Sequence, residues 1–373
     1  RRLMEEKIVR GAALVMTMLA VFICSSLYYL PALETSARQY VARQMQQRKQ
    51  RQQRQEMWAT LSGLEFLDYA TKQAMATAED TDETSEGQLG FSQQLRLELP
   101  AGVTQENVKI ENFYAQRKID IEIPDAGQDY LIRYPMLGSS DHIEDLDYYF
   151  DEQYGVLELS MEHVYELSLD WEDLYIDFIS PRDLYDRIVV IDAGHGAGMP
   201  GATVDGVQEK DIDLEIVKEL KKVFDSAGDE TLGVYYTRLD DSNPDFADRS
   251  GLANDLEADL FVSVHNNSYP ADPSIHGTAV LYDEKKETDG NSSKHLAQIL
   301  LEQMTGELSS KNMGLVKGND IYIIRTSEPP VALVEVGFMT NPGELANLQD
   351  KGYQKKCARA IYQGIMQALE EGY

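Results

Sequence analysis

Short runs of apolar residues alternate with longer helical segments in the second half of the chain. The runs are four to six residues long and turn residues bound them, which is typical of buried strands. They cover residues 188–191, 234–237, 260–264, 278–282, 321–324 and 331–336. Between them, apolar side chains recur every three or four residues, which predicts helices at 212–224, 245–256, 296–304 and 357–369. This order predicts an α/β domain with a largely parallel sheet and helices on both faces.

The stretch from Phe91 to Phe178 has a different pattern, in which apolar and polar residues alternate one by one. Turn sequences rich in proline, glycine and serine separate six such runs. The runs lie at 95–99, 108–110, 119–123, 157–159, 167–169 and 174–178. Short strands with one buried face and regular turns predict a small, all-β, sandwich-like domain ahead of the α/β domain.

The residues from Gly11 to Leu30 form an uncharged, mostly apolar run of twenty residues. As a helix rising about 1.5 Å per residue, this run spans about 30 Å, which is the thickness of the hydrocarbon core of a membrane. The apolar core of a cleaved secretory signal is shorter, at about 7–15 residues. We therefore expect a retained transmembrane signal anchor, with cleavage after the small residues Thr35-Ser36-Ala37 as the alternative.

These patterns divide the chain into four parts. We expect a transmembrane anchor at 1–33, a basic, glutamine-rich stalk at 34–62, a β-rich domain at 63–184 and an α/β domain at 185–373. The stalk contains the run QMQQRKQRQQRQ, which has no apolar stripe and is expected to be solvated.

Charge is distributed unevenly along the chain, whose net charge is −30. Ten of the 34 lysine and arginine residues lie within residues 1–60, together with only four of the 64 acidic residues. The remainder is strongly acidic, which argues against nucleic acid as a partner. Cys24 lies in the apolar N-terminal run and Cys357 in the last predicted helix, so we expect no disulfide between them.

Residues with metal-binding chemistry stand where the apolar runs end. His195 follows the first run within Asp192-Ala193-Gly194-His195-Gly196, and His265 follows the run at 260–264. Glu209 precedes the first predicted helix, and Glu335 lies inside the last apolar run. Two imidazoles and a carboxylate are the protein ligands of a catalytic zinc site, which keeps a fourth position for water. A carboxylate in a β-strand core is costly unless it is paired or protonated, so the position of Glu335 requires a special reason.

Several of these segments, in the same order, are motifs of a known family. Residues 187–370 resemble the zinc-dependent N-acetylmuramoyl-L-alanine amidases of bacterial cell-wall metabolism. The matching segments are IDAGHG at 191–196, EKD at 209–211, TR at 237–238, ADLFVSVHNN at 258–267, YIIR at 322–325 and VEVGFMTN at 334–341.

The resemblance implies a peptidoglycan hydrolase that cleaves the amide between N-acetylmuramic acid and L-alanine with a zinc-activated water. His195, Glu209 and His265 would bind one zinc ion, and Glu335 would be the catalytic carboxylate. We further expect Arg325 and Asn266 to bind substrate, although Arg325 also suits an ordinary surface position. Asp192 is expected either to orient His195 from behind or to cap its turn.

The same motifs leave two other functions open, a non-catalytic peptidoglycan-binding scaffold and a zinc peptidase that acts on the stem peptide. By position, the β-rich domain is similar to the AMIN-type wall-targeting domains of the family, with a structural spacer as the alternative. The resemblance places the catalytic domain outside the cell membrane, facing the wall, on a single-pass anchor. It also leaves open a regulatory protein partner.

Overall fold

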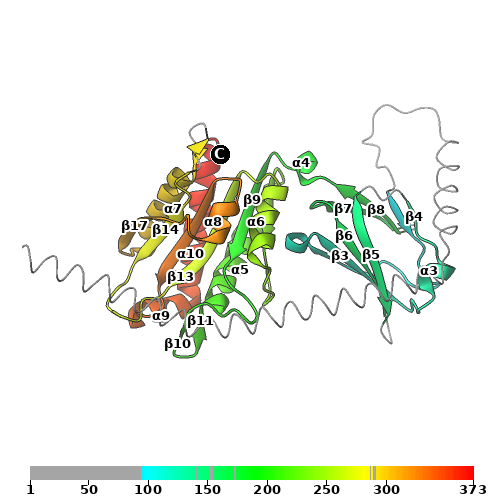
Figure 1. The fold of residues 1–373 in the computed structure, drawn as a ribbon, viewed down its shortest axis with the longest axis horizontal. Helices are drawn as coiled ribbons and strands as arrows, with labels where there is room; N and C mark the ends of the chain where they lie inside the picture. Colours follow the sequence, from blue (N-terminus) through cyan, green and yellow to red (C-terminus); the bar gives the residue numbers. More distant parts are fainter. Residues whose placement is uncertain (1–93, 139–141, 151–153, 172–173, 286, 289–290) are drawn as a thin grey trace, which may run out of the picture. The chain divides into compact units, whose positions relative to one another are not determined.

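The computed structural model describes residues 94–138, 142–150, 154–171, 174–285, 287–288 and 291–373 (Figure 1). The predicted anchor at 1–33 and the predicted stalk at 34–62 lie outside these residues. In the part of the chain that the structure describes, no helix has both the length and the apolar character needed to cross a membrane.

The β-rich part contains two four-stranded antiparallel sheets. One has the order β4-β1-β8-β7, and the other has the order β2-β3-β6-β5. The strands are β1 (Leu95–Leu97), β2 (Lys109–Phe113), β3 (Lys118–Pro124), β4 (Leu137–Gly138), β5 (Ile143–Phe150), β6 (Tyr154–Met161), β7 (Glu166–Asp170) and β8 (Leu174–Ile179). Single helical turns accompany them at η1 (Tyr114–Gln116), α3 (Tyr130–Arg133) and α4 (Pro181–Leu184).

One hydrophobic core joins the two sheets. Alternate residues of β3, such as Ile119 and Ile121, are buried together with Leu157 of β6 and Ile176 of β8. This shared core is the packing expected from the period-two pattern. Strand β5 was not predicted, because the sequence IEDLDYYF carries acidic residues inside the strand and mixes apolar residues over both faces.

The α/β part is built on a six-stranded sheet of order β12-β9-β13-β18-β14-β17. The strands are β9 (Arg187–Ala193), β12 (Leu232–Tyr236), β13 (Leu260–Asn267), β14 (Thr278–Tyr282), β17 (Asn312–Lys317) and β18 (Val331–Phe338). Neighbouring strands are parallel except for β14 and β18, which pair antiparallel. Two small ribbons lie outside this sheet, β10 (Thr203–Val204) with β11 (Val207–Gln208) and β15 (Glu287–Thr288) with β16 (Asn291–Ser292).

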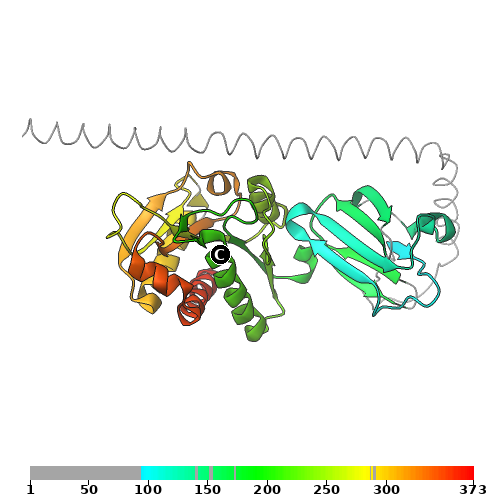
Figure 2. The same cartoon turned by 90° about the horizontal axis from the view of Figure 1, so that it is seen from below.

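Helices cover both faces of this sheet, as predicted (Figure 2). Buried residues of α5 (Glu209–Ala227), α7 (Ser293–Leu308), α9 (Pro342–Gln349) and α10 (Lys351–Glu370) share a core with Val189 and Ile191 of β9. The other face, with Ile188 and Val190 of the same strand, packs against α6 (Phe246–Asp255) and α8 (Tyr322–Thr326). The apolar run Ile188–Ile191 of β9 therefore packs against two helical layers, because successive side chains point to opposite faces.

Two details of the predicted α/β pattern were wrong. Residues 321–324 were predicted as a strand, but Tyr322–Thr326 form the short helix α8. Isoleucine favours strands, yet Ile323 and Ile324 are both buried in one core from a helical turn, so packing overrides the local preference. The edge strand β17 was missed, because NMGLVK contains a glycine and is mostly exposed or half-buried.

Candidate metal centre

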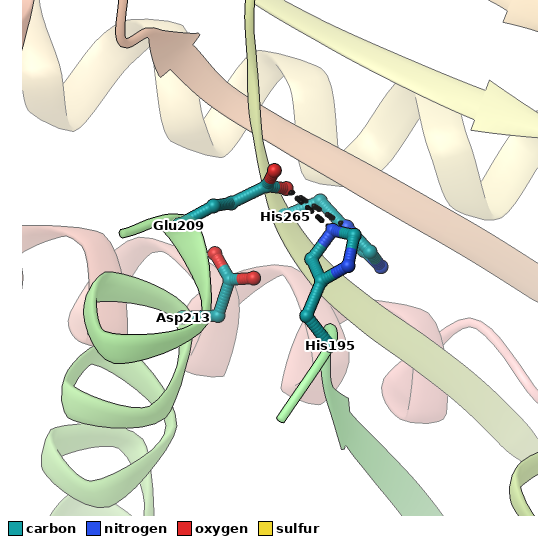
Figure 3. A group of neighbouring side chains, drawn as sticks. All are labelled: His195, Glu209, Asp213 and His265. Carbon is teal, nitrogen blue, oxygen red and sulfur yellow. Dashed lines mark hydrogen bonds and ion pairs between the residues drawn. The ribbon is translucent and has the colours of Figure 1, made fainter. Parts of the chain in front are cut away.

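Four side chains that are distant in sequence meet at one edge of the six-stranded sheet. His195, Glu209, Asp213 and His265 each offer one ligand atom, and these atoms all lie within 4.8 Å of one another (Figure 3). His195 lies in the loop that begins where β9 ends, at Ala193. His265 lies near the end of β13, which pairs parallel with β9. Because parallel strands end at the same edge of a sheet, the two histidines are brought together by the sheet itself.

Glu209 is the centre of this cluster. Its Oε1 lies 3.1 Å from Nε2 of His195 and 3.1 Å from Nδ1 of His265. The same oxygen accepts a hydrogen bond from the backbone N–H of Asn266, and Oε2 accepts one from the N–H of Ala202. Burial alone would raise the pKa of Glu209, but the hydrogen bonds to the two imidazoles hold that pKa well below its usual range. The sequence predicted this convergence of His195, Glu209 and His265.

Two glycines provide the space that the cluster occupies. A Cβ atom on Gly194 would lie 2.4 Å from Cε1 of His265, and one on Gly201 would lie 2.5 Å from Oε2 of Glu209. Gly201 also has a φ of +67°, which side chains disfavour. The backbone therefore approaches the ligands more closely than any other residue type allows.

A buried ion pair fixes the loop that carries His195. The guanidinium of Arg249 donates to Oδ1 of Asp192 at 2.7 Å and to the carbonyl oxygens of Ala193 and His195 at 2.7 and 2.6 Å. His195 has a φ of +61°, so its backbone needs such support. Asp192 was expected to orient His195 or to cap its turn. Its carboxylate accepts hydrogen bonds from Arg249, Thr237 and Ser263, and Arg249 also donates to the carbonyl of His195.

Asp192 remains charged in this position. Burial would raise its pKa, but the charge of Arg249 and the hydroxyl donors outweigh the burial and lower the pKa to about 2.

Arg238 adds a second guanidinium, which donates to the carbonyl oxygens of Ala193 and Gly194 at 2.9 and 2.6 Å. The two arginines thus bind three successive carbonyl groups of the ligand loop.

Glu335 lies beside the cluster on β18. It is the register partner of His265 on the neighbouring parallel strand. Its side chain is half-buried, and Oε2 is buried without a hydrogen-bond partner among the described residues. Burial and the nearby charge of Glu209 raise its pKa to about 8. An unpartnered carboxyl with this pKa is suited to exchanging protons near neutral pH.

The two residues expected to bind substrate have different surroundings. Asn266 is only 2% exposed, and its side-chain amide donates to Oδ1 of Asp213 at 2.7 Å. Arg325 is exposed on α8, where its guanidinium carbon lies 5.6 Å from the centre of the Tyr322 ring. The substrate contacts of Asn266 and Arg325 stay predictions.

Sequence reasoning missed Asp213 and Arg249. Asp213 had a usable signal, because it follows Glu209 by four residues and so occupies the same face of a helix. Arg249 had none in the pattern of α6, since an arginine near the start of an amphipathic helix is ordinarily solvated.

The donor set suits a divalent metal ion. Two imidazole nitrogens and a carboxylate oxygen are the ligands of known catalytic zinc sites. The glycines leave room around them, and neighbouring buried carboxylate oxygens of Asp213 and Glu335 have no hydrogen-bond partner among the described residues. Helix α7 lies between His265 and β17 in the sequence and packs in the core. None of the described residues from 268 to 310 joins the cluster.

Comparison with known proteins gives matches over this half of the chain. Residues 189–367 match a family model described as N-acetylmuramoyl-L-alanine amidase. The uncharacterized protein YqiI of Bacillus subtilis is 36% identical over 179 residues, which is 48% of this chain and 83% of that protein. The N-acetylmuramoyl-L-alanine amidase LytC of the same organism is 32% identical over 178 residues, 48% of this chain and 34% of LytC.

A solved structure is also similar. The crystal structure of an N-acetylmuramoyl-L-alanine amidase from Clostridium difficile 630 is 32% identical, with a TM-score of 0.47. The match covers 50% of this chain and 98% of the solved chain.

Proposed function

The chain belongs to the N-acetylmuramoyl-L-alanine amidase family, and from this premise we propose how its residues hydrolyse peptidoglycan. His195, Glu209 and His265 hold one zinc ion, and the bond cleaved is the amide between N-acetylmuramic acid and L-alanine. The observation that carries the proposal is the approach of both imidazoles to one carboxylate oxygen, at 3.1 Å each. Glu335 lies beside them, and its Oε2 has no hydrogen-bond partner among the described residues.

A zinc ion held by His195, Glu209 and His265 would supply Lewis acidity, which would lower the pKa of a bound water molecule and polarise the scissile carbonyl. The protein holds its ligands in place before substrate arrives. The Arg249–Asp192 pair fixes the His195 loop, and the backbone N–H groups of Ala202 and Asn266 orient the Glu209 carboxylate.

Glu335 moves the proton. Its carboxylate accepts a proton from the attacking water, and the resulting acid returns that proton to the leaving amine nitrogen. In the metal-free protein, burial and the charge of Glu209 raise its pKa to about 8. A bound cation would lower this pKa and favour the carboxylate that accepts the proton. Arg325 is proposed to bind either a carboxylate of the substrate or the oxyanion.

Digestion of purified cell walls tests the proposal. We expect released stem peptides with a free L-alanine amino group, and we expect chelation to abolish their release. Glu335→Gln should lose activity but retain metal, whereas Glu328→Gln, at an exposed glutamate, should keep both. Cleavage within the stem peptide would instead indicate a zinc peptidase, and wall binding without any cleavage would indicate a scaffold. Activity that survives chelation would rule out the mechanism.

A cell-wall amidase acts outside the cytoplasm. We propose that the apolar run at 11–30 anchors the chain in the cell membrane as a single-pass span, with the catalytic domain facing the wall. Protease added to protoplasts, whose membrane is intact, should then remove the catalytic domain from the membrane fraction. Protection of that domain would contradict this orientation.

The β-rich domain is proposed to bind the wall in the manner of AMIN-type domains. Its two sheets share one core, and the aromatic side chains of Tyr149 and Phe150 are exposed. Binding of the full chain to purified walls should weaken when these residues are replaced by serine. Unchanged binding would leave the domain as a spacer.

A further inference from the structure

Asp213 is the one member of the four-residue cluster that the mechanism above does not use. It lies four residues after Glu209 on α5, one helical turn further along the same face. Its carboxylate points toward the space beside Glu209 and His195 (Figure 3). One of its oxygens lies within 4.8 Å of the candidate ligand atoms of the other three residues.

The carboxylate of Asp213 is fully buried and only half satisfied. Its exposed fraction is 0%, and Oδ1 accepts a hydrogen bond from the side-chain amide of Asn266 at 2.7 Å. Oδ2 has no hydrogen-bond partner among the described residues. The guanidinium of Arg238 is nearby, but its hydrogen bonds go to carbonyl oxygens of Ala193, Gly194, Lys210 and Asp240.

A buried carboxylate with a free oxygen is costly unless a cation neutralises it. A divalent ion among the neighbouring ligand atoms supplies the missing positive charge. The position of Asp213 therefore makes sense in the metal-loaded protein.

Asp213 is also linked to two ligands through Asn266. Asn266 directly follows His265, and its backbone N–H donates to Oε1 of Glu209 at 3.1 Å. The bond from its side chain to Asp213 fixes the same residue to α5. Helix α5 and the end of β13 are thereby held in register at the site.

We propose that Asp213 is a positioning residue of the metal centre, whose negative charge raises the affinity of the site for a divalent cation. This inference rests on the proposed metal binding by His195, Glu209 and His265. Asp213→Asn isolates the charge, because the new amide oxygen can still accept from Asn266. Glu219→Gln is the matched control, since Glu219 is 8% exposed on the same helix and pairs with Lys222.

The test measures zinc dissociation constants of the metal-free full-length chain by competition with a chromophoric chelator, and melting temperatures without metal. Asp213→Asn should weaken zinc binding about tenfold or more, as neighbours of metal ligands do. Its metal-free form should melt at the same or a higher temperature, because a neutral amide replaces a buried carboxyl whose Oδ2 has no partner among the described residues. Glu219→Gln should leave zinc binding unchanged.

The outcomes separate this inference from the proposed function. Zinc binding by Asp213→Asn that equals that of the wild type would overturn the inference and leave the proposed function intact. Weaker binding together with a lower metal-free melting temperature would also overturn it, since the residue would then be structural. A wild-type chain that binds no zinc would instead remove the proposed function itself.

Discussion

His265 and Glu335 are direct register partners on the parallel strands β13 and β18. Paired residues of adjacent strands present their side chains on the same face of a sheet, so the candidate base is placed beside a candidate ligand by strand pairing. The residues two and four positions before Glu335, Leu333 and Val331, are buried in the core on that face. Glu335 is thus the next residue on the same face of β18 after Val331 and Leu333, at the edge of the sheet where the cluster lies.

Gly194→Ala should disrupt the metal centre. The new Cβ would lie within 2.4–2.6 Å of three ring atoms of His265, so the imidazole must move away from Glu209. We expect zinc affinity to fall by more than tenfold. Gly198→Ala is the control in the same loop, because its Cβ would meet nothing within 4 Å. Metal titration of both variants checks this, and equal affinities would contradict the geometry.

Arg249→Ala should destabilise the fold as well as the site. The variant leaves the carboxylate of Asp192 buried without its guanidinium, and losing one partner of a buried pair costs about 3–5 kcal/mol. The surface pair of Arg359 and Glu307 offers a comparison, because Arg359→Ala should cost less than about 1 kcal/mol. Denaturant unfolding of the metal-free proteins measures both, and similar losses would show that the buried pair is not structural.

Glu335→Gln should flatten the pH dependence of stability in the metal-free protein. Burial and the charge of Glu209 raise the pKa of Glu335 from 4.5 to about 8. Between these values the folded state holds a proton that the unfolded state has released. The free energy of unfolding contributed by Glu335 is therefore complete below the lower pKa and is lost as pH rises through the upper one.

Urea unfolding in the presence of a chelator, between pH 5 and pH 8, checks this expectation. The wild type should lose more stability over this range than Glu335→Gln. Some dependence should remain in the variant, because burial also raises the pKa of Asp213. Identical slopes for the two proteins would contradict the assigned shift.

Metal removal should lower thermal stability, because the folded chain alone brings the proposed zinc ligands His195, Glu209 and His265 together. Zinc at one hundred times its dissociation constant should stabilise the folded chain by about 2.7 kcal/mol, provided that the unfolded chain does not bind it. His195→Ala should lose this gain, whereas His295→Ala, at an exposed histidine paired with Glu371, should keep it. Calorimetry with and without chelator measures the difference. A gain retained by His195→Ala would place the ion elsewhere.

The sequence anticipated most of the α/β architecture and the central ligand set. Helix and strand periodicity is local, so β9, β13 and β18 and the helices α5, α6, α7 and α10 could be placed from their apolar spacing. Histidines that end two parallel strands must meet at one sheet edge, which made His195 and His265 predictable. The helix α8 and the strand β17 could not be placed this way, because core packing and edge pairing decide them.

By itself, the sequence determined the order of the helices and strands and the kinds of side chain at their ends. Both can be read from the local spacing of apolar and polar residues. Only the tertiary structure decided which buried polar and charged side chains contact one another. It placed Arg249 of α6 against Asp192 and the His195 carbonyl, and Asp213 of α5 against Asn266. Those contacts join segments more than 50 residues apart, and burial rather than spacing sets their energy.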